Sequence, residues 1–418
     1  MHAWDHNAPV ELIVGHSKIL PSALAVRPSP LPSRGVPGEG GHRFNLPPAT
    51  VIATIAPVAN VPVHIPGGAS YEIDVRAGLL ENAGLVLRKL SGSKKIGIVT
   101  DSNVGPKYLG TLETSLRKAD FEPIAIMLPA GEDQKTVQSI SKIYDTILPA
   151  KIDRNTPLVA LGGGVIGDMT GFAAATILRG IPFVQIPTTL LSMVDASVGG
   201  KTGVDHAVGK NLIGAFHQPI TVLIDPNVLR TLPARELRSG LAECIKHEVI
   251  RDADGFRALE QHIGRALALD IDFLTSLIAH NVAIKARVVE ADPYERGERA
   301  HLNFGHTFGH AIEHVSNYSY AHGECVALGM AAASYTAMRL GMIDDATRQR
   351  ISSLISKADL PTRGLKLDTD AVVNAMFFDK KVKGNALRLV LPDRIGHVVI
   401  RLDTPIELVR EAVESLRG

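Results

Sequence analysis

The stretch Pro157-Leu-Val-Ala-Leu-Gly162-Gly163-Gly164-Val-Ile-Gly167-Asp168 joins a short apolar run to a glycine-rich turn and then to a run of small residues. The apolar run predicts a buried strand, and the small-residue run predicts a helix. The glycines match the spacing of a dinucleotide-binding turn, where backbone N–H groups at a helix N-terminus face a pyrophosphate. The stretch therefore predicts one strand, turn and helix unit of an α/β domain.

This turn lacks its usual companion, an acidic residue about twenty positions later that binds a ribose hydroxyl. The next apolar run, Phe183–Thr188, carries no acid. A tight turn without a ligand is therefore one alternative. The other is a nucleotide held by earlier polar segments, Thr100–Asn103 after one apolar run and Gly131–Lys135 after another.

Strands and helices alternate around this unit. Apolar runs near Val61, Lys95 and Glu122 predict further strands with helical stretches between them. After about Pro233, apolar residues recur every three or four positions in the segments 234–250, 253–268, 273–290, 303–315 and 325–340. We therefore expect an α/β domain with a Rossmann-like parallel sheet over residues 61–233, followed by an all-helical domain over residues 234–418.

Residues 1–60 differ in character from the rest. Proline recurs with Gly, Ser and Ala from Pro21 to Pro62 without a sustained period, which predicts a disordered extension. The segment has neither the apolar core of a secretory signal nor the Arg-rich pattern of a transit peptide. We therefore expect a cytoplasmic protein, and organellar targeting by this extension is an alternative that its composition does not support.

The overall composition excludes several classes. Lys+Arg 44 balance Asp+Glu 43, so no overall footprint for nucleic acid or an anionic membrane is present. Cys244 and Cys325 show no disulfide-like spacing, which fits a reducing compartment. No apolar run reaches the ~18 residues of a membrane span.

Histidines cluster in the helical half. His306 and His310 are four positions apart and share a helix face, His322 follows a polar turn, and Glu243 lies in an upstream helical pattern. A carboxylate with imidazoles and no thiolate cluster suits a catalytic divalent metal such as zinc. For any single histidine, packing or helix capping is the alternative, but the clustering favours a metal site.

A second polar stretch, Gly199-Gly-Lys201-Thr202, resembles the end of a phosphate-binding P-loop. That motif needs Gly where this chain has Asp195, which argues against a Walker-type NTPase. Together with Lys210 and Asn211, the stretch places lysines among glycines. Solvated lysines are one interpretation, and close contact with a ligand is the other.

Taken together, the motifs at 161–172, 187–203, 209–216, 242–246, 302–310 and 322–324 closely resemble the 3-dehydroquinate synthase family of sugar phosphate cyclases. The resemblance covers roughly Val61 to the C-terminus. It implies one NAD, one zinc or cobalt ion, and a homodimer. It also implies a phosphate-eliminating lyase of the shikimate pathway, which converts 3-deoxy-D-arabino-heptulosonate 7-phosphate to 3-dehydroquinate and phosphate.

The resemblance also implies roles for individual residues. Glu243, His306 and His322 match the metal ligands, whereas His310 matches a residue near the substrate phosphate and the proton transfers. The positions that match NAD contacts are Asp101, Asn103, Gly131, Glu132, Lys135, Gly163, Gly164, Val165, Gly167, Asp168, Thr188, Thr189, Lys201, Lys210, Thr231 and Leu232. The positions that match substrate or catalytic groups are Asp195, Lys201, Asn211, Lys246, Lys285, Arg299, Asn303, one of Lys380 and Lys381, and Arg179 from the partner subunit.

The implied chemistry explains these residue types. A metal on two adjacent substrate oxygens acidifies a hydroxyl, and NAD takes and returns a hydride around the loss of phosphate, before ring opening and aldol closure. The substrate carries both phosphate and carboxylate. Lysines and arginines therefore gather at one site of a protein whose net charge is only +1.

The chain departs from the family at Asp205, more often Asn, and at His247-Glu248, usually Tyr-Gly. Sister enzymes that act on sedoheptulose 7-phosphate alter the positions of Asn303 and His310, which this chain keeps along with Arg299. A glycerol-dehydrogenase type would share the fold without needing so many cations. A binding protein without turnover is the alternative from another class, and the intact metal, nucleotide and basic sets argue against it.

Overall fold

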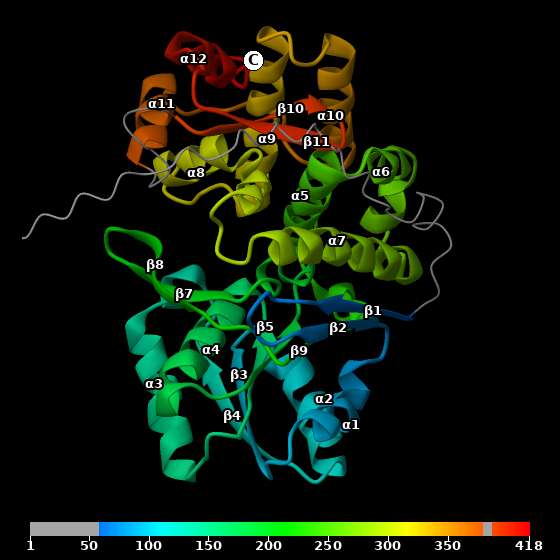
Figure 1. Ribbon diagram of the computed structural model, residues 1–418, viewed down its shortest axis with the longest axis vertical. Helices are drawn as coiled ribbons and strands as arrows, with labels where there is room; N and C mark the ends of the chain where they lie inside the picture. The colour runs from blue at the N-terminus through cyan, green and yellow to red at the C-terminus, as the bar shows by residue number, and fades with distance from the viewer. Residues whose placement is uncertain (1–57, 379–386) are drawn as a thin grey trace, which may run out of the picture. The chain divides into compact units, whose positions relative to one another are not determined.

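The computed structural model describes residues 58–378 and 387–418, so the predicted disorder of residues 1–57 lies outside the described part (Figure 1). The main sheet contains seven strands in the order β1-β2-β9-β6-β5-β3-β4. Their bounds are β1 Val58–Val63, β2 Tyr71–Arg76, β3 Lys95–Asp101, β4 Glu122–Leu128, β5 Leu158–Gly162, β6 Phe183–Pro187 and β9 Thr221–Ile224.

Strand order sets the position of a ligand site. All neighbouring strands run parallel except β1, which pairs antiparallel with β2 at the sheet edge. From β3 the chain first adds β4 on one side and then β5 on the other. In sheets of this type, ligands bind beyond the carboxyl ends of the strands where the order reverses. The fold therefore places such a site beyond Asp101 and Gly162.

Helices cover both faces of the sheet, as in a doubly wound fold. Ile96 and Ile98 of β3 pack in the same cluster as Leu87 of α1 (Ala83–Leu90) and Leu112 of α2 (Gly105–Lys118). The neighbouring Val99 packs in a second cluster with α3 (Val137–Ile147) and α4 (Gly164–Thr176). Because side chains alternate along a strand, these two clusters lie on opposite faces.

The second half is mainly helical, which confirms the predicted fold class. Its helices are α5 Ala234–Arg251, α6 Ala253–Leu267, α7 Ile271–Ala291, α8 His306–Val315, α9 His322–Arg339, α10 Asp345–Lys357, α11 Thr369–Phe378 and α12 Ile406–Glu414. Helices α5, α7 and α9 are buried along most of their length. Helix α9 packs against α8 and α5, so the central helices lie side by side.

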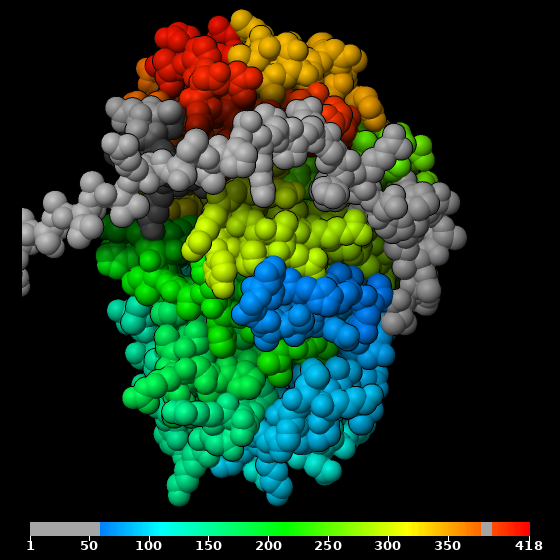
Figure 2. All heavy atoms as spheres, in the orientation of Figure 1, coloured from blue at the N-terminus to red at the C-terminus, as the bar shows by residue number. Residues whose placement is uncertain are grey.

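Helix α7 also contacts the sheet domain. It packs against β1 and against the turn Ser192–Ala196, and the space-filling view shows β1 directly beside it (Figure 2). One helix therefore joins an edge strand of the sheet to the segment that carries Asp195.

Two hairpins add to the predicted elements. Strands β7 (Lys201–His206) and β8 (Gly209–Phe216) pair antiparallel, and β10 (Leu389–Arg394) pairs with β11 (His397–Arg401) within the otherwise helical half. Glycines hide the first hairpin from a periodicity search, because Gly203 and Gly214 face each other across the pair. No helix among the described residues is long and apolar enough to cross a membrane.

Candidate active site

Three helix segments bring one carboxylate and two imidazoles together. Glu243 lies on α5, His306 is the first residue of α8, and His322 is the first residue of α9. Glu243 Oε1 is 3.6 Å from Nε2 of His306 and 3.6 Å from Nε2 of His322. One ligand atom of each residue lies within 4.8 Å of the other two, so a single ion can contact all three.

The environment of Glu243 fits a metal ligand. Its side chain is 1% exposed, and neither carboxylate oxygen accepts a hydrogen bond from the described residues. Burial favours the neutral acid, but interactions led by the charge of Lys246 outweigh it and lower the pKa of Glu243. An ionised, buried carboxylate without hydrogen bonds is costly unless a cation compensates it. Lys246 forms an ion pair with it and supplies part of that compensation.

Burial holds the pKa of His306 well below its usual value, which keeps its ring neutral and able to ligate a metal. His322 is different, because Glu243 and Glu313 outweigh burial and raise its pKa to about 10. Metal binding at His322 would therefore displace a proton.

His310 and Glu313 form the wall of the site beside His322. The ring of His310 lies 5.3 Å from that of His306 and 6.2 Å from that of His322, centroid to centroid. Glu313 Oε2 is 3.6 Å from Nδ1 of His322, and its Oε1 accepts a 3.0 Å hydrogen bond from Lys210. The sequence reading missed Glu313, although it follows His306 and His310 at the i, i+4, i+7 spacing of one helix face.

A second cluster surrounds Asp195, which lies in a π-helical turn, Ser192–Ala196. Asp195 Oδ1 is 2.7 Å from Lys285 Nζ and 3.8 Å from Lys246 Nζ, with His247 Nε2 at 3.7 Å. Burial opposes ionisation, but the two lysines outweigh it and hold the pKa of Asp195 well below its usual value. Lys246 touches both Asp195 and Glu243, so it links this cluster to the metal ligands.

Most positions expected to bind NAD follow the carboxyl ends of adjacent parallel strands. By strand these are Asp101 and Asn103 for β3, Gly131, Glu132 and Lys135 for β4, Gly163, Gly164, Val165, Gly167 and Asp168 for β5, Thr188 and Thr189 for β6, and Thr231 and Leu232 for β9. They therefore share one edge of the sheet, at the reversal of strand order. The remaining two positions lie at the starts of the hairpin strands. Lys201 is the first residue of β7, and Lys210 is the second residue of β8.

The start of α4 can accept an anion. Gly163 caps the helix without a side-chain hydrogen bond to its first N–H groups. A Cβ at Gly163 would lie 3.1 Å from Thr189 Cγ2, and one at Gly164 would lie 3.3 Å from the Cβ of Ala196. Glycine thus keeps the backbone open above the turn, as a pyrophosphate requires.

Polar contacts join this turn to the hairpin. Lys135 Nζ donates to Asp168 Oδ2 at 2.6 Å and to Asn211 Oδ1 at 2.5 Å. Burial favours neutral lysine, yet Asp168 and Glu132 outweigh it and raise the pKa of Lys135. Asn211 has a φ of 55°, a left-handed conformation that asparagine tolerates better than most residues. Lys135 therefore holds Asn211, a predicted substrate group, beside the nucleotide edge.

Several side chains that are expected to bind the anionic substrate contact the loop before α8. Lys201 and Asn303 both contact Glu295, Asn303 through a 3.0 Å hydrogen bond from Nδ2. Arg299 is 2% exposed and donates to the carbonyls of Pro293 at 2.6 Å and Gly199 at 3.2 Å. Its buried Nε has no hydrogen-bond partner among residues 58–378 and 387–418.

The structure does not place Arg179 or the lysines Lys380 and Lys381 at this site. Arg179 lies just past the C-terminal end of α4, whereas Gly164 begins that helix at the carboxyl edge of the sheet. A helix of 13 residues spans roughly 20 Å, so Arg179 is at the other edge. Lys380 and Lys381 lie outside the described residues.

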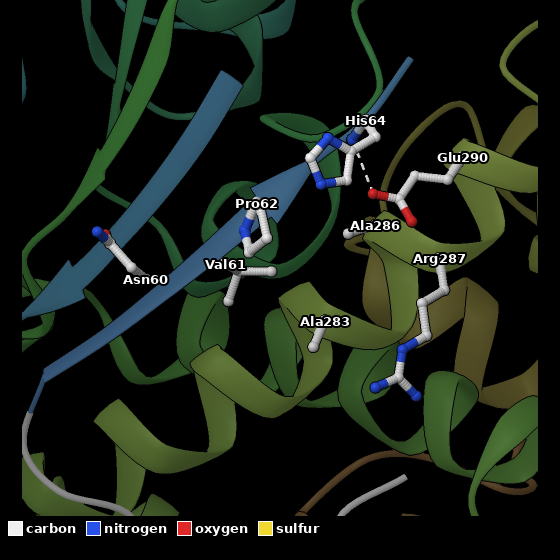
Figure 3. A pocket seen from close by; sticks show the side chains of 8 residues that line it. All are labelled: Asn60, Val61, Pro62, His64, Ala283, Ala286, Arg287 and Glu290. Carbon is white, nitrogen blue, oxygen red and sulfur yellow. Dashed lines mark hydrogen bonds between the residues drawn. The ribbon is translucent and has the colours of Figure 1, made fainter. Parts of the chain in front are cut away.

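A cavity of about 300 Å³ lies elsewhere, between β1 and α7 (Figure 3). Its lining includes Ala283, Ala286, Arg287 and Glu290, which share one face of α7. Glu290 Oε1 accepts a 2.7 Å hydrogen bond from the backbone N–H of His64. None of the expected site residues lines this cavity.

Comparison with known proteins identifies the family of this chain. The family profile described as 3-dehydroquinate synthase N-terminal matches residues 125–239, and the profile described as 3-dehydroquinate synthase C-terminal matches residues 240–382. The 3-dehydroquinate synthase of Microcystis aeruginosa is 49% identical over 356 residues, which cover 84% of this chain and 97% of the relative. The 3-dehydroquinate synthase of a Synechococcus strain is 48% identical over 362 residues, which cover 85% of this chain and 98% of the relative.

Among solved structures, ValA of Streptomyces hygroscopicus, a 2-epi-5-epi-valiolone synthase with NAD+ and Zn2+ bound, is 30% identical with a TM-score of 0.77. The match covers 84% of this chain and 97% of that one. Both halves of the chain, with the glycine-rich turn and the Glu243, His306 and His322 cluster, thus lie within one family. This protein belongs to the 3-dehydroquinate synthase family.

Proposed function

We propose that this chain converts 3-deoxy-D-arabino-heptulosonate 7-phosphate to 3-dehydroquinate and phosphate, with one NAD and one divalent metal. The observation that carries the proposal is the buried carboxylate of Glu243, without hydrogen bonds, between His306 and His322. Next to it lie two buried lysines, Lys246 and Lys285, around Asp195. A metal site bordered by buried ammonium groups suits an anionic substrate.

Glu243, His306 and His322 would hold the metal, and the turn before α4 would hold the NAD pyrophosphate. When bound, the metal polarises adjacent substrate oxygens and NAD accepts and returns a hydride. The relative ValA carries NAD+ and Zn2+, which supports both assignments here.

The basic cluster has a defined task in this scheme. Asp195, held ionised by its neighbours, positions the ammonium groups of Lys246 and Lys285. Burial lowers the pKa of Lys285 to about 8, against the opposing pull of Asp195. Its Nζ can therefore give up or regain a proton near neutral pH while the substrate phosphate is bound and released. His310, beside the metal ligands, is proposed as the second group that moves a proton.

The substrate carboxylate is proposed to bind near Arg299 and Asn303. Glu295 now contacts both Lys201 and Asn303, so these groups already accommodate one carboxylate. Burial lowers the pKa of Arg299 from its usual value, but a guanidinium remains charged at every working pH. Its unpaired Nε is a donor that a planar anion can use.

The chain is proposed to act as a homodimer. Arg179 lies roughly 20 Å from the glycine turn of its own subunit, because the 13 residues of α4 separate them. It therefore serves catalysis only from a partner subunit. Leu178 and Arg179 both have positive φ, 49° and 66°, so this corner is held in an unusual conformation.

A sister activity on sedoheptulose 7-phosphate is the main alternative, favoured by the likeness to ValA. Offering both heptulose phosphates side by side, with phosphate release as readout, separates the two. Preference for the carboxylate-bearing substrate is expected, because Arg299 and Asn303 are both present. Preference for sedoheptulose 7-phosphate would contradict the proposal. A dehydrogenase of the same fold would instead accumulate NADH.

A further inference from the structure

A second group of metal-binding side chains lies where α5 ends, α6 begins and α7 passes. Glu248 is on the last turns of α5, Asp252 stands between α5 and α6, and His280 is in the middle of α7. Nε2 of His280 is 3.1 Å from Asp252 Oδ2 and 3.3 Å from Glu248 Oε2. Their side chains are 0% to 7% exposed, so this group is closed to solvent.

The facing atoms of this group lack hydrogen-bond partners. None of Glu248 Oε2, Asp252 Oδ2 and His280 Nε2 takes part in a hydrogen bond with a described residue. Both carboxylate oxygens therefore lie off the axis of the ring nitrogen, although they are close to it. A protonated ring has a single N–H at Nε2, which cannot point at two oxygens. The ligand atoms of the three residues lie within 4.8 Å of one another, close enough for one ion to contact all three.

The distances fit a small divalent ion. Ligand atoms about 2.1 Å from a tetrahedral ion are about 3.4 Å from each other. The separations of 3.1 and 3.3 Å around His280 Nε2 are close to that value. Two carboxylates and one imidazole form a donor set typical of zinc and neighbouring transition metals.

The remaining oxygens of the two carboxylates are held from outside. Asp252 Oδ1 accepts hydrogen bonds from the N–H groups of Asp254 at 2.9 Å and Gly255 at 3.1 Å. Glu248 Oε1 accepts one from Asn281 Nδ2 at 3.3 Å. Such outer contacts are how proteins aim metal-ligating carboxylates.

Gly255 keeps the site open. A Cβ there would lie 2.0 Å from Glu248 Oε2 and 3.0 Å from His280 Nε2, so a larger residue would displace both ligands.

We propose that Glu248, Asp252 and His280 bind a divalent transition-metal ion such as zinc, distinct from the ion held by Glu243, His306 and His322. The second ion has a structural role, because it joins the end of α5, the start of α6 and the middle of α7, and α5 and α7 also carry Glu243 and Lys285. The proposal does not rest on the enzymatic activity.

The test is a metal count on the full chain, stripped with a chelator, reloaded with Zn2+ and freed of unbound metal. We expect two ions per chain in the wild type by elemental mass spectrometry, and one in E243Q, which retains the second site. D252N should also hold one ion. One ion in the wild type with none in E243Q would overturn the proposal, as would two ions in D252N.

D270N is the matched control for D252N. Asp270 caps α7 by accepting the N–H of Phe273, much as Asp252 caps α6, but Asp270 belongs to none of the candidate ligand groups among the described residues. An asparagine still caps through its side-chain oxygen. D270N should therefore keep two ions, so loss in D252N alone reports the metal site rather than the helix cap.

Cobalt in E243Q provides a second readout that survives if another variant folds poorly. Binding of Co2+ to E243Q should give visible d–d absorption and raise the melting temperature. An absence of both in folded E243Q would overturn the proposal.

Discussion

Asp195 Oδ1 and Lys285 Nζ are 2.7 Å apart, and the lysine side chain is only 6% exposed. Burial of an ammonium normally drives its pKa down, while a carboxylate partner drives it up. In Lys285 burial prevails, helped by the nearby charge of Arg299, and lowers the pKa to about 8. The pair thus places a titrating cation beside Asp195, which also lies 3.8 Å from Lys246, the ion-pair partner of Glu243.

This titration predicts the basic limb of the pH profile. Lys285 is charged below about pH 8 and neutral above it, so kcat/KM should fall as the pH rises through that value. In the variant K285R the charge persists, because an arginine keeps its proton beyond pH 12. In K285R the fall of kcat/KM should therefore occur at higher pH, even if the maximal kcat/KM of the variant is lower. An unchanged limb in K285R would assign the titration to another group.

Removing the metal should abolish activity, and zinc or cobalt should restore it. The variant E243Q should lose more than the 10–100-fold that changes around the ligands typically cost, because it removes a ligand charge. E260Q is a suitable control, since Glu260 is also on a helix but pairs with Arg350. Turnover in excess chelator, with metal shown absent, would contradict the assignment.

Arg299→Ala should lower kcat/KM by roughly 10²- to 10⁴-fold, because an unpaired buried charge costs ~3–5 kcal/mol. R299K should recover only part of this, since an ammonium lacks the planar fork of donors. Arg299 also donates to the carbonyls of Pro293 and Gly199, so the thermal unfolding of each variant must be compared. Near-normal turnover in a folded R299A would rule out the carboxylate-binding role.

NAD should be required but not consumed. Product and phosphate should form while absorbance from NADH stays flat, because the hydride returns to the substrate within each cycle. Measuring phosphate and NADH in the same cuvette checks this. Accumulation of NADH in step with product would favour the dehydrogenase alternative.

A chain beginning near Pro57 should fold and keep its kcat/KM, because every expected site residue lies after β1. The structure moves the useful boundary earlier than residue 60. A start at Asn60 would remove Val58 and Ala59, which pair with Arg76 and Val75 of β2. An insoluble or inactive protein from the Pro57 start would show that the segment before it is needed.

Local patterns in the sequence were enough to predict the strand, turn and helix unit around Gly162 and the helices α5 to α9. They also grouped Glu243 with His306, His310 and His322. The family resemblance then implied Glu243, His306 and His322 as the ligands, and the structure brings these three together. The hairpin at Lys201–Phe216 escaped detection because glycines interrupt its alternation. Glu248 and His280 escaped too, because only the packing of α5 against α7 places them together.

The cavity between β1 and α7 borders the helix that carries Lys285. Its helix residues, Ala283, Ala286, Arg287 and Glu290, lie on the side of α7 opposite Lys285, which points to Asp195. One helix thus separates the cavity from the Asp195–Lys285 pair, so an effect of the cavity lining on that pair would pass through the position of α7.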